Sequence, residues 1–241
     1  MATHWRYREL ALGLKLAGAW IWRFETHEET RDALFPIFAD GCCDVVWHGA
    51  QGGAQGQVWR TYSLPPTITG LVLPIGPNTR MAGLRLLPGQ VHSLFGRSTA
   101  SIPPQGLVLD DPKWASPETA HLAMAANLNL SQLDLALQSL MAGDGPATTC
   151  ERFNISARTL RRKVQSMTGC SPKQLQRMWR LRRALFLAGQ VECPDWSDTE
   201  HQCGYADQAH LNRDSRALMD CTPTDLHHLL KQGQVAVSSN T

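Results

Sequence analysis

The sequence predicts an α+β fold: a small β-rich domain shaped as a barrel or sandwich, then an all-α domain of two helix-turn-helix units joined by a long helix. Short apolar runs between glycine- and proline-rich turns fill residues 1–112, which is typical of small antiparallel domains. Alanine, leucine and methionine become frequent after residue 116, which favours helices. The segment 160–175 also recurs 51 positions later at 211–226. This repeat predicts two copies of one helical unit.

Composition limits the classes of protein that the chain can belong to. Its 241 residues, 43% hydrophobic and 18% charged, suit a soluble protein of two modest domains. No apolar run approaches the roughly 18–20 residues that cross a bilayer, and the first residues lack the apolar segment of a signal peptide. We therefore expect a cytoplasmic protein without a membrane partner. Seven cysteines without a CxxC pair predict neither a disulfide framework nor a metal site, and we expect no cofactor.

The β-rich domain is expected over residues 1–112, where turns such as Gly76-Pro77 separate short runs such as 43–47. Ser116-Pro117-Glu118 combines a capping residue, a proline at the first helical position and an early acid. We therefore expect a linker helix over residues 113–130.

The all-α domain is expected over residues 131–230. Its first helix, over 131–141, carries leucines along one face and ends at Gly143-Asp144-Gly145. The last stretch, residues 231–241, is polar, and we expect a flexible tail.

The first unit of the repeat has the layout of a helix-turn-helix, in which the second helix enters the DNA major groove. A support helix over 146–153 leads through a turn at Asn154 to a recognition helix over 157–167, capped by Ser156. Core-facing residues recur at helical spacing: Leu160, Val164 and Met167. Three arginines then point outward and are expected to read guanine: Arg158, Arg161 and Arg162. Phosphate contact alone is the alternative for these arginines, and it is our expectation for Ser156 and Thr159.

The helix that starts at Ser171-Pro172 and runs to about residue 188 links the two units. At about 1.5 Å per residue it spans roughly 26 Å, a useful strut between recognition helices that must sit about 34 Å apart on DNA. The first turn, with Pro172 and Lys173, is expected to contact a phosphate. Trp179 is expected in the core and not as a base-stacking platform.

In the second unit, Asp207 caps a helix whose core positions are Leu211 and Leu218. Amide side chains suit adenine, arginine suits guanine, and a small apolar side chain suits the thymine methyl group. Four base-reading candidates follow: Gln208, Ala209, Asn212 and Arg213. His210 and Thr222 are candidates for phosphate contacts.

Charge supports a nucleic-acid partner. From Glu151 to Leu185 the chain has ten lysines and arginines against one acid. Such a stripe is typical of a phosphate-binding surface, although a solvated helix face is the alternative reading of any basic helix.

The two units resemble the AraC/XylS family of bacterial transcription regulators. The first carries Ser156-x-Arg158-Thr159-Leu160-x-Arg162, then Gly169-x-Ser171-Pro172-x-x-Leu175. The second carries Gly204-Tyr205-x-Asp207-Gln208-x-His210-Leu211-x-Arg213 with Thr222-Pro223. The resemblance covers roughly 131–230 and implies a sequence-specific, non-enzymatic DNA-binding regulator whose two recognition helices lie in adjacent major grooves. It implies double-stranded DNA and RNA polymerase as partners.

The N-terminal half is similar to a short β-rich domain of one AraC-type subgroup. The matching pieces are Asp40-Gly41-Cys42-x-Asp44-Val45, Gly76-Pro77-x-Thr79 and Gly83-x-Arg85 with Pro88-Gly89. The similarity implies a sensor or dimerisation domain, so a small-molecule effector and a homodimer both stay open. Our candidates for effector binding are Trp47, Arg85 and His92.

Two departures from the family pattern affect the second unit. Thr199 and Glu200 stand where the family places an aliphatic residue and alanine, and a glutamate between helices is costly unless it reaches solvent or a partner. Asp220 stands where the first unit has Gly169. The second unit could therefore bind weakly or mainly position the first.

Two other functions remain as alternatives. The N-terminal domain could be an enzyme with thiol chemistry at Cys42 or Cys43, although Asp44, His48, Arg85 and His92 form no recognisable triad or metal set. The chain could also be a sensor with degenerate DNA contacts that acts by association with another protein.

Overall fold

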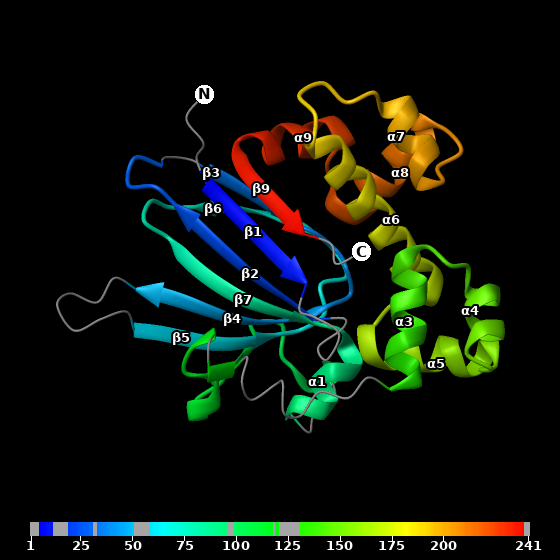
Figure 1. Cartoon of the computed structure of the whole chain (residues 1–241), viewed down its shortest axis with the longest axis horizontal. Helices are drawn as coiled ribbons and strands as arrows, with labels where there is room; N and C mark the ends of the chain where they lie inside the picture. The colour runs from blue at the N-terminus through cyan, green and yellow to red at the C-terminus, as the bar shows by residue number, and fades with distance from the viewer. Residues whose placement is uncertain are drawn as a thin grey trace.

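The computed structural model describes residues 5–11, 19–30, 33–50, 58–95, 99–117, 119–120 and 131–238. It shows a β-rich N-terminal domain beside a helical C-terminal domain (Figure 1). The N-terminal domain contains β1 (Trp5–Ala11), β2 (Ala19–Thr26), β3 (Ala33–Ile37), β4 (Cys43–Ala50), β5 (Val58–Leu64), β6 (Leu71–Ile75), β7 (Arg80–Leu86), α1 (Pro88–Phe95), β8 (Leu107–Val108) and the 3-10 helices η2 (Thr99–Ser101) and η3 (Pro112–Trp114). The C-terminal part contains α3 (Gln132–Ala142), α4 (Pro146–Arg152), α5 (Ala157–Thr168), α6 (Pro172–Gly189), α7 (Trp196–Cys203), α8 (Gln208–Met219), α9 (Pro223–Lys231) and β9 (Gly233–Ser238). The α+β prediction is confirmed.

The strands form one large sheet and one ribbon. The sheet has the order β8-β5-β4-β7-β2-β1-β9, and β3 pairs with β6 as a separate two-stranded ribbon. Neighbouring strands are antiparallel except β1 and β9, which are parallel. Aromatic rings fill the space between ribbon and sheet: the ring of Phe35 on β3 lies 4.6 Å from Phe24 and 5.1 Å from Trp5. The ribbon is thus held to the sheet by burial of large apolar side chains.

Strand β9 corrects the expectation of a flexible tail over residues 231–241. Residues 233–238 instead pair with β1 along six positions, from Trp5 opposite Gly233 to Leu10 opposite Ser238 (Figure 1). A side chain at Gly233 would place its Cβ atom 2.1 Å from the Trp5 ring, so only glycine allows this close approach. The alternation of Val235 and Val237 was the available sequence signal, and the polar composition around it concealed it.

The helical domain follows the repeat. Each unit ends its support helix and turns into its recognition helix, and α6 lies between the units (Figure 1). Of the core side chains predicted from helical spacing, Met167 is half-buried and four are buried: Leu160, Val164, Leu211 and Leu218. Capping boxes start α6 at Ser171 and α9 at Thr222. A linker helix was expected over residues 113–130. The first residues of this range belong to the 3-10 helix η3, and residues 118 and 121–130 lie outside the described part of the chain.

No helix among the described residues is both long and apolar enough to cross a membrane.

Candidate nucleic-acid interface and effector cavity

The first recognition helix, α5, is built by local backbone chemistry. Asn154 adopts a left-handed conformation, with φ of 48°, and turns the chain out of α4. The Ser156 hydroxyl accepts a hydrogen bond from Thr159 N and starts the helix. With Leu160 and Val164 fully buried, three candidate base readers are exposed on the opposite side: Arg158, Arg161 and Arg162. This surface suits insertion into a major groove.

The second recognition helix, α8, has the same construction with different side chains. Asp207 accepts a hydrogen bond from His210 N and caps the helix. Gln208, Ala209 and Arg213 are exposed, and Asn212 is half-buried. Asp220 ends the helix in a left-handed conformation, with φ of 55°, so it performs the role of Gly169 in the first unit.

Glu200 is the weak point of this second unit. It is only 7% exposed on α7, and its Oε1 has no hydrogen-bond partner among the described residues. Burial, followed by the neighbouring Asp207 and Asp195, raises the pKa of its carboxyl group. The cost expected for a glutamate at this position is therefore present in the fold.

Part of the basic stripe has a structural role, which corrects its interpretation as a continuous phosphate-binding surface. Arg182 is buried and binds Glu9. Arg177 and Arg180 both bind Asp214 on α8, at 2.8 and 3.1 Å, and so hold the second recognition helix against α6. The charge that stays exposed for DNA is concentrated on α5.

The phosphate candidates divide in the same way. Lys173 is exposed, but Pro172 is buried and has no N–H to donate. At Thr222 the hydroxyl is already bonded to Asp225, whose carboxylate would repel a phosphate at the start of α9. His210 Nε2 lies 3.3 Å from Arg180 and packs edge-on against Tyr205, within the protein.

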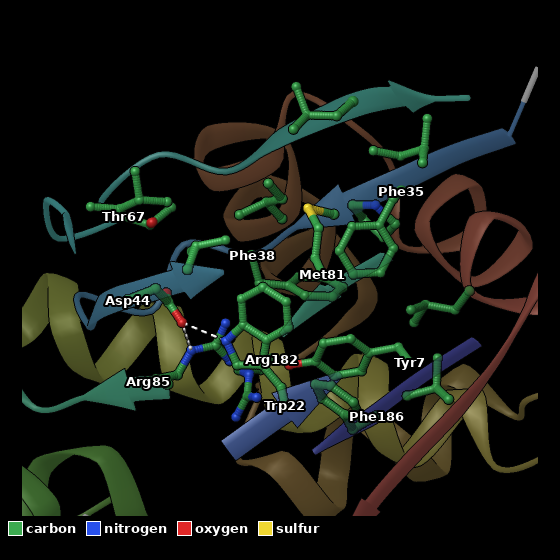
Figure 2. Close-up of a pocket in the computed structure, with 18 residues that line it drawn as sticks. Tyr7, Trp22, Phe35, Phe38, Asp44, Thr67, Met81, Arg85, Arg182 and Phe186 are labelled. Atoms are coloured by element: carbon green, nitrogen blue, oxygen red, sulfur yellow. Dashed lines mark hydrogen bonds and ion pairs between the residues drawn. The ribbon is translucent and has the colours of Figure 1, made fainter. Parts of the chain in front are cut away.

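A cavity of about 240 Å³ lies between the N-terminal sheet, the ribbon and the helices α6 and α9 (Figure 2). Its wall is mainly aromatic and aliphatic, which is typical of a small-molecule site. Large side chains come from both domains: Tyr7, Trp22, Phe35, Phe38, Met81 and Phe186. Of the expected effector residues, Arg85 lines this cavity. Trp47 belongs to a separate core, where its Nε1 donates to Trp114 O, and His92 lies on α1, with its side chain outside the described part.

An ion-pair network forms the polar floor of the cavity, and Figure 2 shows its pair of Arg85 and Asp44. Glu9 Oε2 accepts from Arg85 at 3.0 Å, and Glu9 Oε1 accepts from Arg182 at 2.7 Å. Arg85 Nε also lies 3.2 Å from Asp40 and 3.5 Å from Asp44. Burial alone would raise the pKa of Glu9, but Arg182 and Arg85 outweigh it and lower the pKa to about 2. Glu9 therefore stays ionised and joins β1 to α6.

Sequence reasoning missed Tyr7, Trp22, Asp44 and Arg182 as cavity residues. They come from four separate elements, β1, β2, β4 and α6. Arg182 and its partner Glu9 are 173 positions apart in the sequence. No local pattern announces such a site, because only the packing of the two domains assembles it.

The thiol alternative finds no support in the geometry. Cys42 and Cys43 are both buried, and burial raises the pKa of each thiol well above its usual range. Both groups are therefore protonated and shielded, unlike a reactive thiolate. Among the described residues, no three His, Cys, Asp or Glu side chains cluster as metal ligands.

The N-terminal domain contacts the last turns of both recognition helices. Gly70 N donates to Leu218 O at 2.7 Å at the end of α8. In the same loop, Ile68 lies 3.9 Å from where a Cβ atom on Gly169 would stand, just after α5. Thr99 on η2 donates to Met167 O near the end of α5. These contacts leave the N-terminal turns of α5 and α8 exposed.

Comparison with known proteins agrees with this geometry. Residues 149–228 match the helix-turn-helix domain family. No curated protein matches the chain significantly.

Two solved proteins illustrate the structural likeness. The C-terminal domain of AraT, a response regulator from Geobacillus stearothermophilus, is 19% identical, with 46% of this chain and 92% of that one covered and a TM-score of 0.38. Apo ToxT K231A from Vibrio cholerae is 10% identical, with 89% and 98% covered and a TM-score of 0.49. Wild-type ToxT from Vibrio cholerae strain SCE256, solved with a bound unsaturated fatty acid, is 10% identical, with 95% of this chain and 96% of that one covered and a TM-score of 0.42.

Two capped helix-turn-helix units joined by one long helix, within residues that match the helix-turn-helix domain family, have the construction of a DNA-binding domain. The chain is a DNA-binding transcriptional regulator.

Proposed function

We propose that this regulator reads two adjacent major grooves and that a small molecule in the cavity controls this reading. Base contacts are assigned to exposed or half-buried side chains of both recognition helices: Arg158, Arg161, Arg162, Gln208, Ala209, Asn212 and Arg213. Phosphate contacts are assigned to Lys173, Ser156 and Thr159. Contact with RNA polymerase and pairing into a homodimer belong to the same proposal. They follow from the family resemblance alone.

One observation carries the effector role: the loop between β5 and β6 connects the cavity to both recognition helices. Leu64 and Thr67 line the cavity at one end of this loop. At its other end, Gly70 and Ile68 contact the ends of α8 and α5. A molecule that displaces the loop would therefore change how both helices are held, which supports a coupling between ligand and DNA.

DNA recognition is tested by selecting genomic fragments with the purified full-length chain at two salt concentrations. We expect a shared site with two half-elements about one helical turn apart, whose retention falls steeply as salt rises. A single short element would mean that the α7–α8 unit does not read bases, and no enrichment at either salt concentration would contradict the proposal.

The effector role is tested by filling the cavity. Met81→Trp enlarges a lining residue, and we expect the affinity for the selected site to change by about fivefold or more, in the range usual for coupled sites. His48→Trp is the matched control, because His48 is exposed on β4. Equal DNA affinity of both variants and the wild type would contradict control through the cavity.

A further inference from the structure

The charged groups at the floor of the cavity are unequal in number. Among the described residues, three carboxylates, Glu9, Asp40 and Asp44, face two cations, Arg85 and Arg182. Glu9 uses both guanidinium groups, at 3.0 and 2.7 Å. Arg85 Nε also lies 3.2 Å from Asp40 and 3.5 Å from Asp44, and Arg182 interacts electrostatically with Asp40. With all five groups ionised, the floor carries one excess negative charge.

Asp44 places a negative charge at the wall of the cavity. It is the one carboxylate of the three that lines the cavity, and the residue is only 9% exposed. Its Oδ1 accepts from Trp22 Nε1 at 2.7 Å and lies 3.5 Å from Arg85 Nε. An ionised carboxylate can accept about four hydrogen bonds, so Asp44 can also accept from a donor on a ligand.

Two further properties match a cation. Burial, followed by Asp40 and Glu9, raises the pKa of Asp44 against the opposing effects of Arg85 and the Trp22 hydrogen bond. A cation on a ligand would stabilise the ionised form of Asp44. The rings of Trp22 and Phe35 also line the cavity, and aromatic faces attract ammonium groups.

We infer that the cavity binds a bicyclic aromatic molecule with one positive charge, whose ammonium group donates to Asp44. Since an apolar cavity of about 150 Å³ holds benzene, the volume of about 240 Å³ suits a bicyclic ring with a short arm. A carboxylate ligand would add a second uncompensated negative charge at the same place. The inference rests on the proposed effector role of the cavity and specifies the chemistry of the effector.

The test uses three probes with the same indole ring and two-carbon arm. Tryptamine is a cation, tryptophol is neutral, and indole-3-propionate is an anion at pH 7. We expect calorimetric titration of the full chain to give a Kd for tryptamine about tenfold below that of tryptophol, with the carboxylate weakest, because a buried charge-assisted hydrogen bond is worth about that ratio. Equal or tighter binding of indole-3-propionate would overturn the charge assignment and leave the cavity as an effector site. No binding of any probe would overturn both.

The variant Asp44→Asn tests whether Asp44 causes the preference for tryptamine over tryptophol. The ratio between tryptamine and tryptophol should fall to about one in this variant and stay near tenfold in Glu25→Gln. Glu25 is a matched control because it is exposed on β2 and its replacement changes the net charge by the same amount. Tryptophol binding by Asp44→Asn verifies that its cavity is intact, and an unchanged ratio in that variant would overturn the role of Asp44. Should Asp44→Asn not fold, the order of the three probes on the wild-type chain decides the matter alone.

Discussion

Glu9 is the residue that bonds the N-terminal sheet to the DNA-binding domain. It accepts hydrogen bonds from Arg85 on β7 and from Arg182 on α6, and it is 3% exposed. Buried ion pairs add little stability compared with an apolar pair, but removal of one partner leaves a buried charge without compensation. Removal of the Glu9 carboxylate would therefore leave the buried guanidinium groups of Arg85 and Arg182 without this partner.

Replacement of Glu9 by glutamine should lower the free energy of unfolding by about 3–5 kcal/mol. Urea denaturation measures the loss, and the exposed Glu25→Gln should change it by less than about 0.5 kcal/mol. Because the pKa of Glu9 is lowered from 4.5 to about 2, its stabilisation is complete above pH 4.5 and is lost as the pH falls through that interval towards 2. The difference in stability between wild type and Glu9→Gln should shrink over the same interval. A constant difference would contradict the ion-pair network.

Variants of Arg162 and Lys173 test base reading and phosphate binding separately. Both side chains are exposed, Arg162 on the recognition helix α5 and Lys173 on the first turn of α6. Arg162→Ala should cost about 1–3 kcal/mol on the selected site and relax its base preference. Lys173→Ala should weaken all sequences alike and reduce the salt slope by about one. Fluorescence anisotropy at several salt concentrations checks both. Wild-type binding by both variants would remove this surface from the interface.

At the scale of elements, Gly70 allows the loop between β5 and β6 to pack closely against the end of α8. A Cβ atom on Gly70 would lie 2.0 Å from Met219 Sδ and 2.9 Å from Ile37 O, and the latter is backbone that cannot rotate away. Gly70→Ala should therefore displace the loop and break the hydrogen bond to Leu218 O, at a cost of about 1–3 kcal/mol in unfolding free energy. Gly76→Ala is the matched control, since nothing lies within 4 Å of its Cβ position. Equal unfolding midpoints of the two variants would show that the loop is not held as described.

The elements that the sequence could predict are those with local signals. Caps at Ser156 and Asp207, and the left-handed turn at Asn154, act over three or four residues, so their pattern is visible in the chain. The cavity had no such signal, because Glu9 and Arg182 meet only after two domains pack. For the same reason the sequence could not show that Arg177, Arg180 and Arg182 on α6 pair within the protein: charge is visible in a sequence, but the partner that neutralises it is not.

At the scale of the whole molecule, β9 adds a strand from the C-terminal part of the chain to the N-terminal sheet. The strand follows α9 directly and pairs with β1, and Val235 on it lines the cavity (Figure 1). The two domains are therefore joined by backbone hydrogen bonds as well as by the Glu9 network. Since β1 would otherwise be a sheet edge, β9 also covers a row of backbone groups that favour pairing with another chain.

A chain that ends after Gln232 should lose both effects of β9. With β1 uncovered, we expect concentration-dependent self-association in light scattering, because open strand edges pair with each other. Removal of residues 239–241 alone is the control and should leave the molecular mass unchanged, since β9 ends at Ser238. With one of its links to the N-terminal sheet removed, the helical domain should also show a smaller change in DNA affinity when Met81→Trp fills the cavity. If the shortened chain keeps both its mass and the full response, β9 neither protects the sheet nor couples the domains, and the Glu9 network and the loop at Gly70 carry the coupling without it.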